Sequence, residues 1–120
     1  MNHCLVDTSV WITHFRHPAK ELIEHLEHRL VLTHSAVIGE LACGSIPKRK
    51  IFLQDLLLLP RCQEASFEEV LQLIDQHHLF GIGLSWVDMQ LLASALLSNA
   101  ILLTHDKKLK DSFLRLKRYC

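Results

Sequence analysis

Short apolar runs alternate with longer helical patterns along the 120-residue chain, and this alternation constrains the fold more than any other feature. HCLV (3–6), LVLT (30–33) and AILLT (100–104) read as strands, and RCQEA (61–65) is a weaker candidate. Strands separated by helices favour a parallel sheet, because a parallel connection needs a crossover. We therefore expect an α/β fold in which helices sandwich a mostly parallel central sheet.

Helix start signals lie between these runs. The predicted helices are VWITHF (10–15) capped by Thr8 or Ser9, PAKELIEHLEHR (18–29), AVIGELACG (36–44) capped by Ser35, KRKIFLQDLLLL (48–59), FEEVLQLIDQHHL (67–79), WVDMQLLASALLSN (86–99) and KKLKDSFLRL (107–116). Ser66 with Glu69, and Ser85 with Asp88, have the spacing of a capping box. The 86–99 segment is apolar almost all round, so we expect a central, buried helix there.

Composition narrows the class of protein. A chain of this length with 49% apolar residues suits one core, so we expect a single domain over residues 1–120. Thirteen Lys and Arg balance thirteen Asp and Glu, so nucleic-acid binding would need a local basic patch. Cys4, Cys43, Cys62 and Cys120 are scattered without a CxxC pair, which favours a reducing cytoplasm over a thiolate zinc site. We expect no secretory signal and no membrane contact.

Four acidic residues stand in apolar surroundings. Asp7 follows CLV, Glu40 lies between AVIG and LACG, Asp88 lies in the apolar 86–99 segment, and Asp106 follows AILLTH. Each has an ordinary explanation by itself: Asp88 as the third residue of a capping box, Asp106 as a helix N-cap, and Glu40 as a half-buried acid paired with a lysine. The other acids, including Glu64, fit a solvated surface.

The joint placement of these acids is more informative than any one of them. Asp7 and Asp106 both follow predicted strands, and we place Glu40 and Asp88 in the first turns of helices. In a parallel sheet such positions share one edge, so all four side chains can converge on one pocket. Clustered carboxylates repel one another unless a cation lies among them, and an oxygen-only donor set suits Mg²⁺ or Mn²⁺. The pattern predicts a divalent metal site.

The segments that carry these acids resemble the four acidic motifs of the PIN-domain family, and more narrowly those of the VapC-type ribonuclease toxins. LVDTSVWI, VIGELACG, GIGLSWVDMQLLASALL and LLTHDKKL occur in the family's order and span nearly the whole chain. The resemblance implies that Asp7, Glu40, Asp88 and Asp106 form a catalytic quartet that binds Mg²⁺ or Mn²⁺. Asp7 and Asp88 are the leading candidates for direct ligands.

Further residues follow from the same resemblance. Thr8, Ser9 and Thr104 match small hydroxyl positions that orient carboxylates or a water in such sites. Positive charge for substrate binding would come from Lys107 and Lys108 beside Asp106, from Arg16, or from the KRK run at 48–50. His105 fits a surface position or a phosphate contact better than a general base.

The resemblance implies a metal-dependent endoribonuclease, the toxin of a toxin–antitoxin pair, that leaves 5′-phosphate and 3′-hydroxyl ends on RNA. It also implies a homodimer and a cognate antitoxin, whose amphipathic segment could contact Trp11, Phe15 or the apolar side of residues 51–59. Two alternatives stay open. One is a catalytically silent PIN-like module that binds RNA or protein. The other is a receiver-type signalling domain, which needs an adjacent acidic pair where this chain has Asp7 and Thr8.

Overall fold

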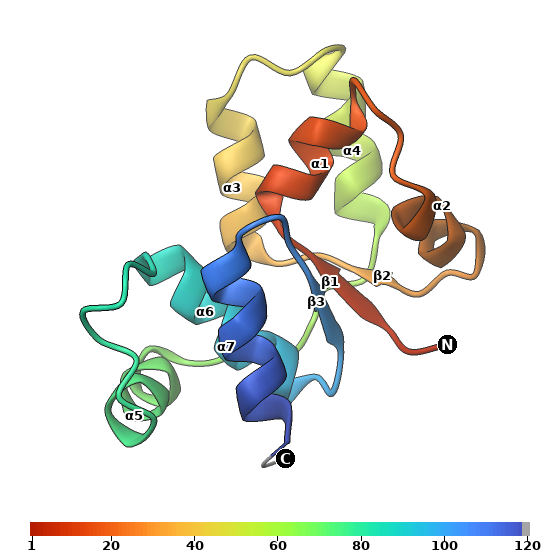
Figure 1. Ribbon diagram of the computed structural model, residues 1–120. Helices are drawn as coiled ribbons and strands as arrows, with labels where there is room; N and C mark the ends of the chain where they lie inside the picture. Colours follow the sequence, from red (N-terminus) through yellow and green to blue (C-terminus); the bar gives the residue numbers. More distant parts are fainter. Residues whose placement is uncertain (119–120) are drawn as a thin grey trace.

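A computed structural model of the chain describes residues 1–118, which form three strands and seven helices (Figure 1). The strands are β1 (Cys4–Val6), β2 (Val31–Leu32) and β3 (Ile101–Leu103), and they form a parallel sheet in the order β2-β1-β3. The central strand β1 is completely buried, as expected for a parallel strand covered on both faces. The predicted α/β fold with a parallel sheet is confirmed.

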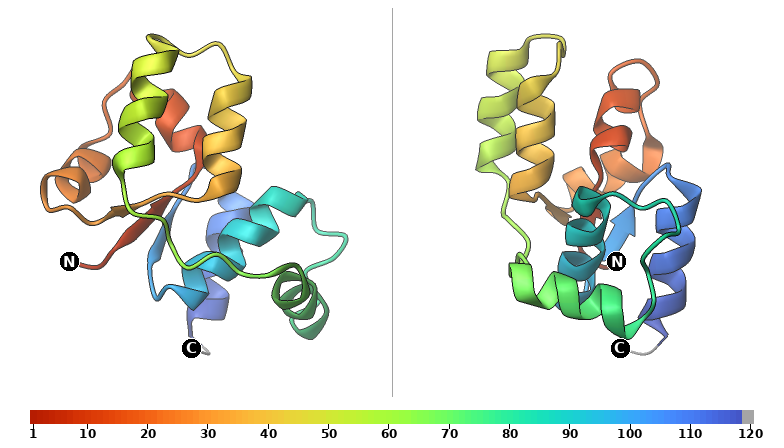
Figure 2. Two further views of the ribbon diagram at one scale, coloured as in Figure 1. Left: turned by 180° about the vertical axis from the view of Figure 1, so that it is seen from behind. Right: turned by 90° about the vertical axis from the view of Figure 1, so that its left-hand side faces the viewer.

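The helices form two groups around this sheet. They are α1 (Thr8–His14), α2 (Lys20–Glu27), α3 (Ser35–Cys43), α4 (Arg49–Leu58), α5 (Phe67–Gln76), α6 (Trp86–Leu97) and α7 (Lys107–Lys117). Figures 1 and 2 show α3 and α4 as a helical hairpin next to α1, with α5, α6 and α7 grouped together away from that hairpin. Both groups contribute helix ends to the edge of the sheet where β1 and β3 end.

Helix α6 is the buried helix that its composition predicts. Its middle residues are buried over Leu91, Leu92, Ala93, Ser94 and Ala95, whereas its ends reach solvent. None of the helices in residues 1–118 combines the length and the apolar character needed to cross a membrane.

The weak strand expected at 61–65 is wrong as a strand. Only one parallel bridge forms there, between Arg61 and Thr33. The next backbone groups turn away from the sheet, because the N–H groups of Gln63 and Ala65 donate to the hydroxyls of Ser98 and Ser94 on α6. A segment whose backbone donors are used by side chains cannot extend a ladder.

Two of the expected helix caps are also wrong. Asp7 caps α1 in place of Thr8 or Ser9, and His34 caps α3 in place of Ser35. In both cases the helix begins earlier than the hydroxyl pattern suggests, because the residue before the first hydroxyl already accepts a backbone N–H, from Thr8 in α1 and from Ala36 in α3. Asp7 directly follows β1, and His34 directly follows Thr33, which forms the bridge to Arg61.

Candidate active site

Asp7 lies at the carboxyl end of β1 and is 7% exposed. Its Oδ1 accepts the backbone N–H of Thr8 at 2.7 Å, and its Oδ2 accepts the hydroxyl groups of Ser9 at 3.2 Å and Thr104 at 2.7 Å. Its own N–H donates to Leu103 O at 2.9 Å. These donors compensate a buried carboxylate and fix its orientation.

Thr104 connects Asp7 to the next acid of the cluster. Its buried hydroxyl donates to Asp7 and accepts the backbone N–H of Asp106 at 3.0 Å. Asp106 is the N-cap of α7 and accepts the N–H of Leu109 at 3.1 Å through Oδ1. The ordinary N-cap explanation is therefore correct, and it leaves the Oδ2 atom of an exposed carboxylate free of hydrogen bonds from described residues.

Asp88 is held in a similar way at the start of α6. The Ser85 hydroxyl accepts the Asp88 N–H at 3.1 Å, and Asp88 Oδ2 accepts the Ser85 N–H at 2.9 Å, so the capping box is complete. One carboxylate oxygen is used in this box and Oδ1 is not. The Asp88 side chain therefore caps α6 and lines the pocket at the same time.

Glu40 departs from the expected placement. It is the sixth residue of α3, so it lies in the second turn of the helix and not the first. It is exposed, and its Oε1 accepts the Thr8 hydroxyl at 2.7 Å. No Lys or Arg within the described residues forms an ion pair with it, so the alternative explanation, a half-buried acid paired with a lysine, is wrong. Thr8 takes that place, because α1 starts directly against α3.

One open pocket is lined by all four acids, although they come from four different segments of the chain. Its lining residues are Asp7, Thr8, Ser9, Ile12, Glu40, Asp88, His105 and Asp106. Thr104 does not line the pocket, but its hydroxyl donates to Asp7 Oδ2. Arg16, Lys107 and Lys108 do not line the pocket.

The chemistry of this donor set fits a hard divalent cation. None of the four carboxylates forms an ion pair with a Lys or Arg of residues 1–118, so their mutual repulsion is uncompensated by protein cations. Within the described part of the chain, however, no three or more His, Cys, Asp or Glu side chains lie close enough together to hold a metal ion by themselves. Mg²⁺ keeps several waters and binds through one or two carboxylates, so an open group of acids with unused oxygens suits it better than a cage would.

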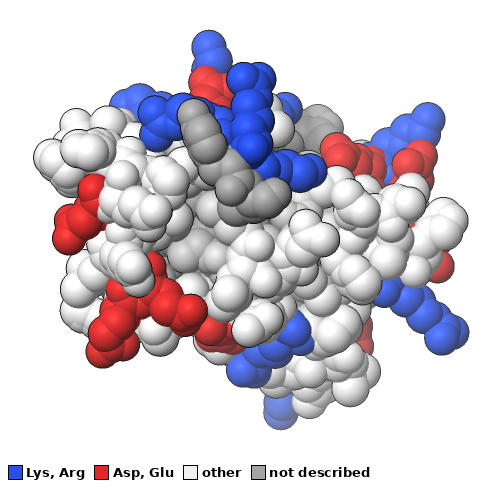
Figure 3. All heavy atoms as spheres, turned by 90° about the horizontal axis from the view of Figure 1, so that it is seen from below, with Lys and Arg blue, Asp and Glu red and all other residues white. Residues whose placement is uncertain are grey.

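Lys108 lies over Gly83 rather than over the pocket. Gly83 has φ of +92°, and a Cβ atom there would stand 2.8 Å from Lys108 Nζ. The lysine therefore covers the segment that leads into α6. The basic residues of the last turn of α7, Arg115 and Lys117, are separated from Asp106 by a helix about 16 Å long. Figure 3 shows Lys and Arg side chains gathered around that end of α7, apart from a group of Asp and Glu side chains.

His34 and Glu64 make polar contacts at the start of α3 that the sequence pattern does not predict. His34 is 2% exposed and caps α3, and Glu64 accepts hydrogen bonds from Ser35 at the start of the same helix. Glu64 was expected to be a plain surface acid. Nothing in the local pattern around it indicates a contact with a residue 29 positions away.

A parallel α/β fold with four carboxylates at the edge where its strands end is the architecture of a PIN domain. The family model for the PIN domain matches residues 4–112, and the chain belongs to this family. Because a PIN match covers most of the chain, the receiver-domain alternative is wrong.

Similar proteins narrow the class further. Two proteins named Ribonuclease VapC32, from Mycobacterium tuberculosis strains CDC 1551 / Oshkosh and ATCC 25618 / H37Rv, are each 45% identical to this chain over 107 residues. The alignments cover 88% of this chain and 86% of each relative, which confirms the resemblance to VapC-type proteins. The crystal structure of PAE2754 from Pyrobaculum aerophilum has a TM-score of 0.59 and 18% identity, covers 99% of this chain and 91% of that chain, and shows the same fold.

Proposed function

We propose that this protein is a metal-dependent endoribonuclease and the toxin of a type II toxin–antitoxin pair, acting in the cytoplasm. The observation that carries the proposal is the pocket in which Asp7, Glu40, Asp88 and Asp106 meet without a protein cation. The similarity to proteins named as VapC ribonucleases supports RNA as the substrate.

Asp7 and Asp88 would hold Mg²⁺ or Mn²⁺ directly, and Glu40 and Asp106 would complete the site through direct or water-mediated contacts. A bound divalent ion supplies an activated water and neutralises charge on the scissile phosphate. Thr8 holds Glu40, and Ser9 and Thr104 hold Asp7, so these hydroxyls keep carboxylate oxygens turned to the pocket. Attack by water on phosphorus with cleavage of the P–O3′ bond, the 3′ oxygen leaving and taking up a proton, would give 5′-phosphate and 3′-hydroxyl ends.

Substrate contacts would come from residues around the rim of the pocket. His105 lines the pocket itself, and Lys107 follows Asp106 directly on an exposed turn. Arg16 and Lys108 stay candidates for contacts with more distant phosphates. Because the formal net charge of the chain is zero, such contacts act locally.

A second surface suits the antitoxin. A largely apolar groove lies between α1, α2 and α4, and its lining residues are Trp11, His14, Phe15, Leu26, Phe52, Asp55, Leu56 and Leu59. The Trp11 indole Nε1 is buried there and has no hydrogen-bond partner within the described residues. Because that nitrogen is inaccessible, an amphipathic segment would fill the groove through apolar contacts with its lining residues. We also propose that the protein is a homodimer.

The test is RNA cleavage by the pure protein. Incubation of total RNA with Mg²⁺ or Mn²⁺ should produce fragments with 5′-phosphate ends, and chelation with EDTA should stop cleavage. Asp7→Asn and Asp88→Asn should abolish cleavage while the far-UV circular dichroism stays unchanged. Asp75→Asn, an exposed position on α5, is the matched control and should cleave normally. RNA binding without cleavage in either metal would support the catalytically silent module, and full activity in excess EDTA would refute the metal mechanism.

A further inference from the structure

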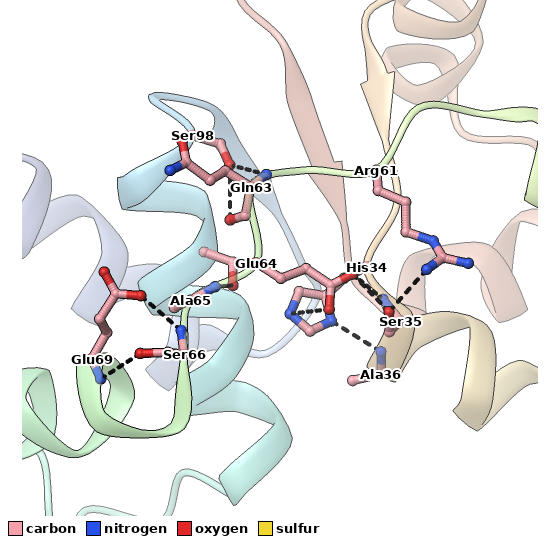
Figure 4. A network of polar contacts seen from close by, with 11 residues as sticks. His34, Ser35, Ala36, Arg61, Gln63, Glu64, Ala65, Ser66, Glu69 and Ser98 are labelled. Atoms are coloured by element: carbon pink, nitrogen blue, oxygen red, sulfur yellow. Dashed lines mark hydrogen bonds and ion pairs between the residues drawn. The ribbon is translucent and has the colours of Figure 1, made fainter.

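The side chains of Ser94 and Ser98 fasten the segment between α4 and α5 to α6, and Figure 4 shows the contact between Ser98 and Gln63. Ser98 Oγ accepts the N–H of Gln63 at 2.9 Å and donates to the carbonyl of the same residue at 3.3 Å. One turn earlier on α6, Ser94 Oγ accepts the N–H of Ala65 at 3.0 Å. The residue between these two anchors, Glu64, is therefore held at a fixed distance from α6.

Glu64 extends from this segment to the first turn of α3. Its Oε2 accepts both the backbone N–H of Ser35 at 3.1 Å and the Ser35 hydroxyl at 2.7 Å. Arg61 adds a third contact, because its Nη1 donates to Ser35 Oγ at 3.2 Å. Figure 4 shows the Glu64 carboxylate between His34 and Ser35, so one side chain joins the linker to the start of α3.

His34 is the N-cap of α3. Together with Ser35, Arg61 and Glu64 it forms a group of contacts that we call the junction. Its Nδ1 accepts the N–H of Ala36 at 2.9 Å. Only a neutral imidazole can accept at Nδ1, so the proton sits on Nε2, which has no hydrogen-bond partner within the described residues and lies 3.9 Å from Glu64 Oε1. The distance between Nε2 and Oε1 is short enough for an ion pair. Because Nδ1 accepts the cap hydrogen bond, however, the ring is neutral, and the contact is between a neutral imidazole and a carboxylate.

The helix held in this way carries Glu40. α3 has nine residues, fewer than an isolated helix needs to be stable in water, so it depends on its cap and its tertiary contacts. Glu40 lies five residues beyond Ser35, about 7.5 Å along the helix axis. Asp88 is carried by α6, the helix to which the Glu64 segment is fastened. The junction thus lies between the two helices that bring Glu40 and Asp88 to the pocket.

We propose that His34 and Glu64 are positioning residues that set Glu40 against Asp88, and that they do so only while His34 is neutral. The proposal rests on the proposed function for the role of Glu40, but the geometry that it describes can be measured without RNA. Neither residue lines the pocket, so neither is a catalytic residue.

Protonation of His34 opposes this arrangement for three reasons. An imidazolium cannot accept the Ala36 N–H, its charge lies unfavourably at a helix N-terminus, and the side chain is buried. The charged groups that face the ring are Glu64, which favours protonation, and Arg61, which disfavours it. Burial is the largest effect and holds the pKa of His34 below its ordinary 6.5. The cap is therefore intact near neutral pH and is lost as the pH falls through this lowered pKa.

The experiment compares variants that separate capping from titration. His34→Ala removes the cap, whereas His34→Asn keeps a side-chain acceptor that does not titrate in this range. Glu64→Ala removes the link to Ser35, and Glu64→Gln keeps one acceptor oxygen. Ser66→Ala is the control, because it removes the cap of α5, a helix that contributes nothing to the pocket. Each is assayed for Mn²⁺ affinity by electron paramagnetic resonance, for amide exchange in α3, and for RNA cleavage between about pH 5 and about pH 8.

His34→Ala and Glu64→Ala should each weaken Mn²⁺ binding about 10-fold and speed amide exchange through Glu40. Ser66→Ala should do neither. His34→Asn should restore Mn²⁺ affinity and cleave with a shallower loss of rate on the acid side than the wild type. Unchanged Mn²⁺ affinity in both alanine variants, or an unchanged acid limb in His34→Asn, would overturn the proposal. If no variant cleaves RNA, including the wild type, the proposed function fails while the Mn²⁺ and exchange data still decide the role of His34.

Discussion

Thr104 Oγ1 lies 2.7 Å from Asp7 Oδ2, although 97 residues separate the two in the chain. Parallel pairing of β1 with β3 makes this contact possible, because Val6 is aligned with Leu103 and both strands end at the same edge. The buried Thr104 hydroxyl thus fixes the buried Asp7 carboxylate across the ends of two paired strands. The hydrogen bond joins the first and the last acidic motif of the chain.

Replacing Thr104 by valine should uncouple these motifs. The change keeps the shape of the side chain but leaves the Asp7 carboxylate short of a donor and the Asp106 N–H without its acceptor. We expect a loss of about 1.5–3 kcal/mol in the free energy of unfolding and a roughly 10- to 100-fold loss in Mn²⁺ affinity. Urea denaturation and Mn²⁺ titration measure the two effects.

Thr33→Val is the matched control for that substitution. Thr33 is also a buried threonine that follows a strand, but its hydroxyl has no hydrogen-bond partner within the described residues. Removing an unsatisfied hydroxyl should leave stability unchanged or raise it. Thr104→Ser keeps both hydrogen bonds and should bind Mn²⁺ like the wild type. Equal losses in Thr33→Val and Thr104→Val would mean that the Thr104 hydroxyl has no special role.

The two capping boxes provide a second paired test. Ser85 and Ser66 each accept an N–H at 3.1 Å, from Asp88 and Glu69 respectively, and each box is complete. Ser85→Ala and Ser66→Ala should therefore each lower the free energy of unfolding by about 1 kcal/mol. Only Ser85→Ala should also slow RNA cleavage, by about 10-fold, because the lost hydroxyl loosens the first turn of α6 that carries Asp88, even though the Ser85 N–H can still donate to Asp88 Oδ2. Equal cleavage rates for both variants would show that the box does not orient Asp88.

Two glycines should respond to alanine with opposite signs. Gly39 lies inside α3 with open space around its Cα, so Gly39→Ala should raise the free energy of unfolding by about 0.5–1 kcal/mol. Gly83→Ala should lower it by about 1 kcal/mol or more, because the residue has positive φ and faces the Lys108 side chain. Lys108→Ala in the Gly83→Ala background should relieve the contact but not the backbone strain. Thermal unfolding of the three variants tests these signs.

The thiols should differ sharply in reactivity. Burial, with a smaller contribution from Glu21, raises the pKa of Cys4 to about 12, and burial together with Glu64 raises that of Cys62 to about 11. Cys43 is exposed. In a Cys120→Ser background, which removes the cysteine that lies outside the described residues, Ellman's reagent should label Cys43 alone in the native protein and all three thiols in denaturant. Fast labelling of Cys4 without denaturant would contradict the buried β1 strand.

The same shifts predict a loss of stability in alkali. Both thiols have a raised pKa in the folded state, so their contribution is fully present below the ordinary value of 9.0. It should be lost as the pH rises from 9.0 toward the folded values, because the unfolded chain ionises first. Urea denaturation at several pH values should show this fall in the wild type, and Cys4→Ala should make the slope shallower.

The order of the elements and the meeting of the four acids follow from local pattern. Apolar runs such as CLV and ILL mark strands, periodic segments mark helices, and parallel strands place Asp7 and Asp106 at one edge whatever the details of packing. The capping boxes at Ser66 and Ser85 are equally local, because both partners lie within four residues.

Other features depend on contacts between distant segments. Glu64 contacts a residue 29 positions away, Glu40 is held by Thr8, and Lys108 lies over Gly83. No short motif encodes these pairs, because each requires that two or three elements already be packed in a particular orientation. The RCQEA segment shows the same limit, since Ser94 and Ser98 decide where its backbone donors go.

The amino-acid sequence by itself thus determined a parallel α/β fold, its helices and the set of acids at its edge, because hydrophobic period and strand polarity are properties of short stretches. Only the tertiary structure decided how those acids are oriented and which side chains hold them. Hydrogen bonds and burial act between neighbours in space, and the pairing of β1 with β3 and the packing of the helices around the sheet select those neighbours.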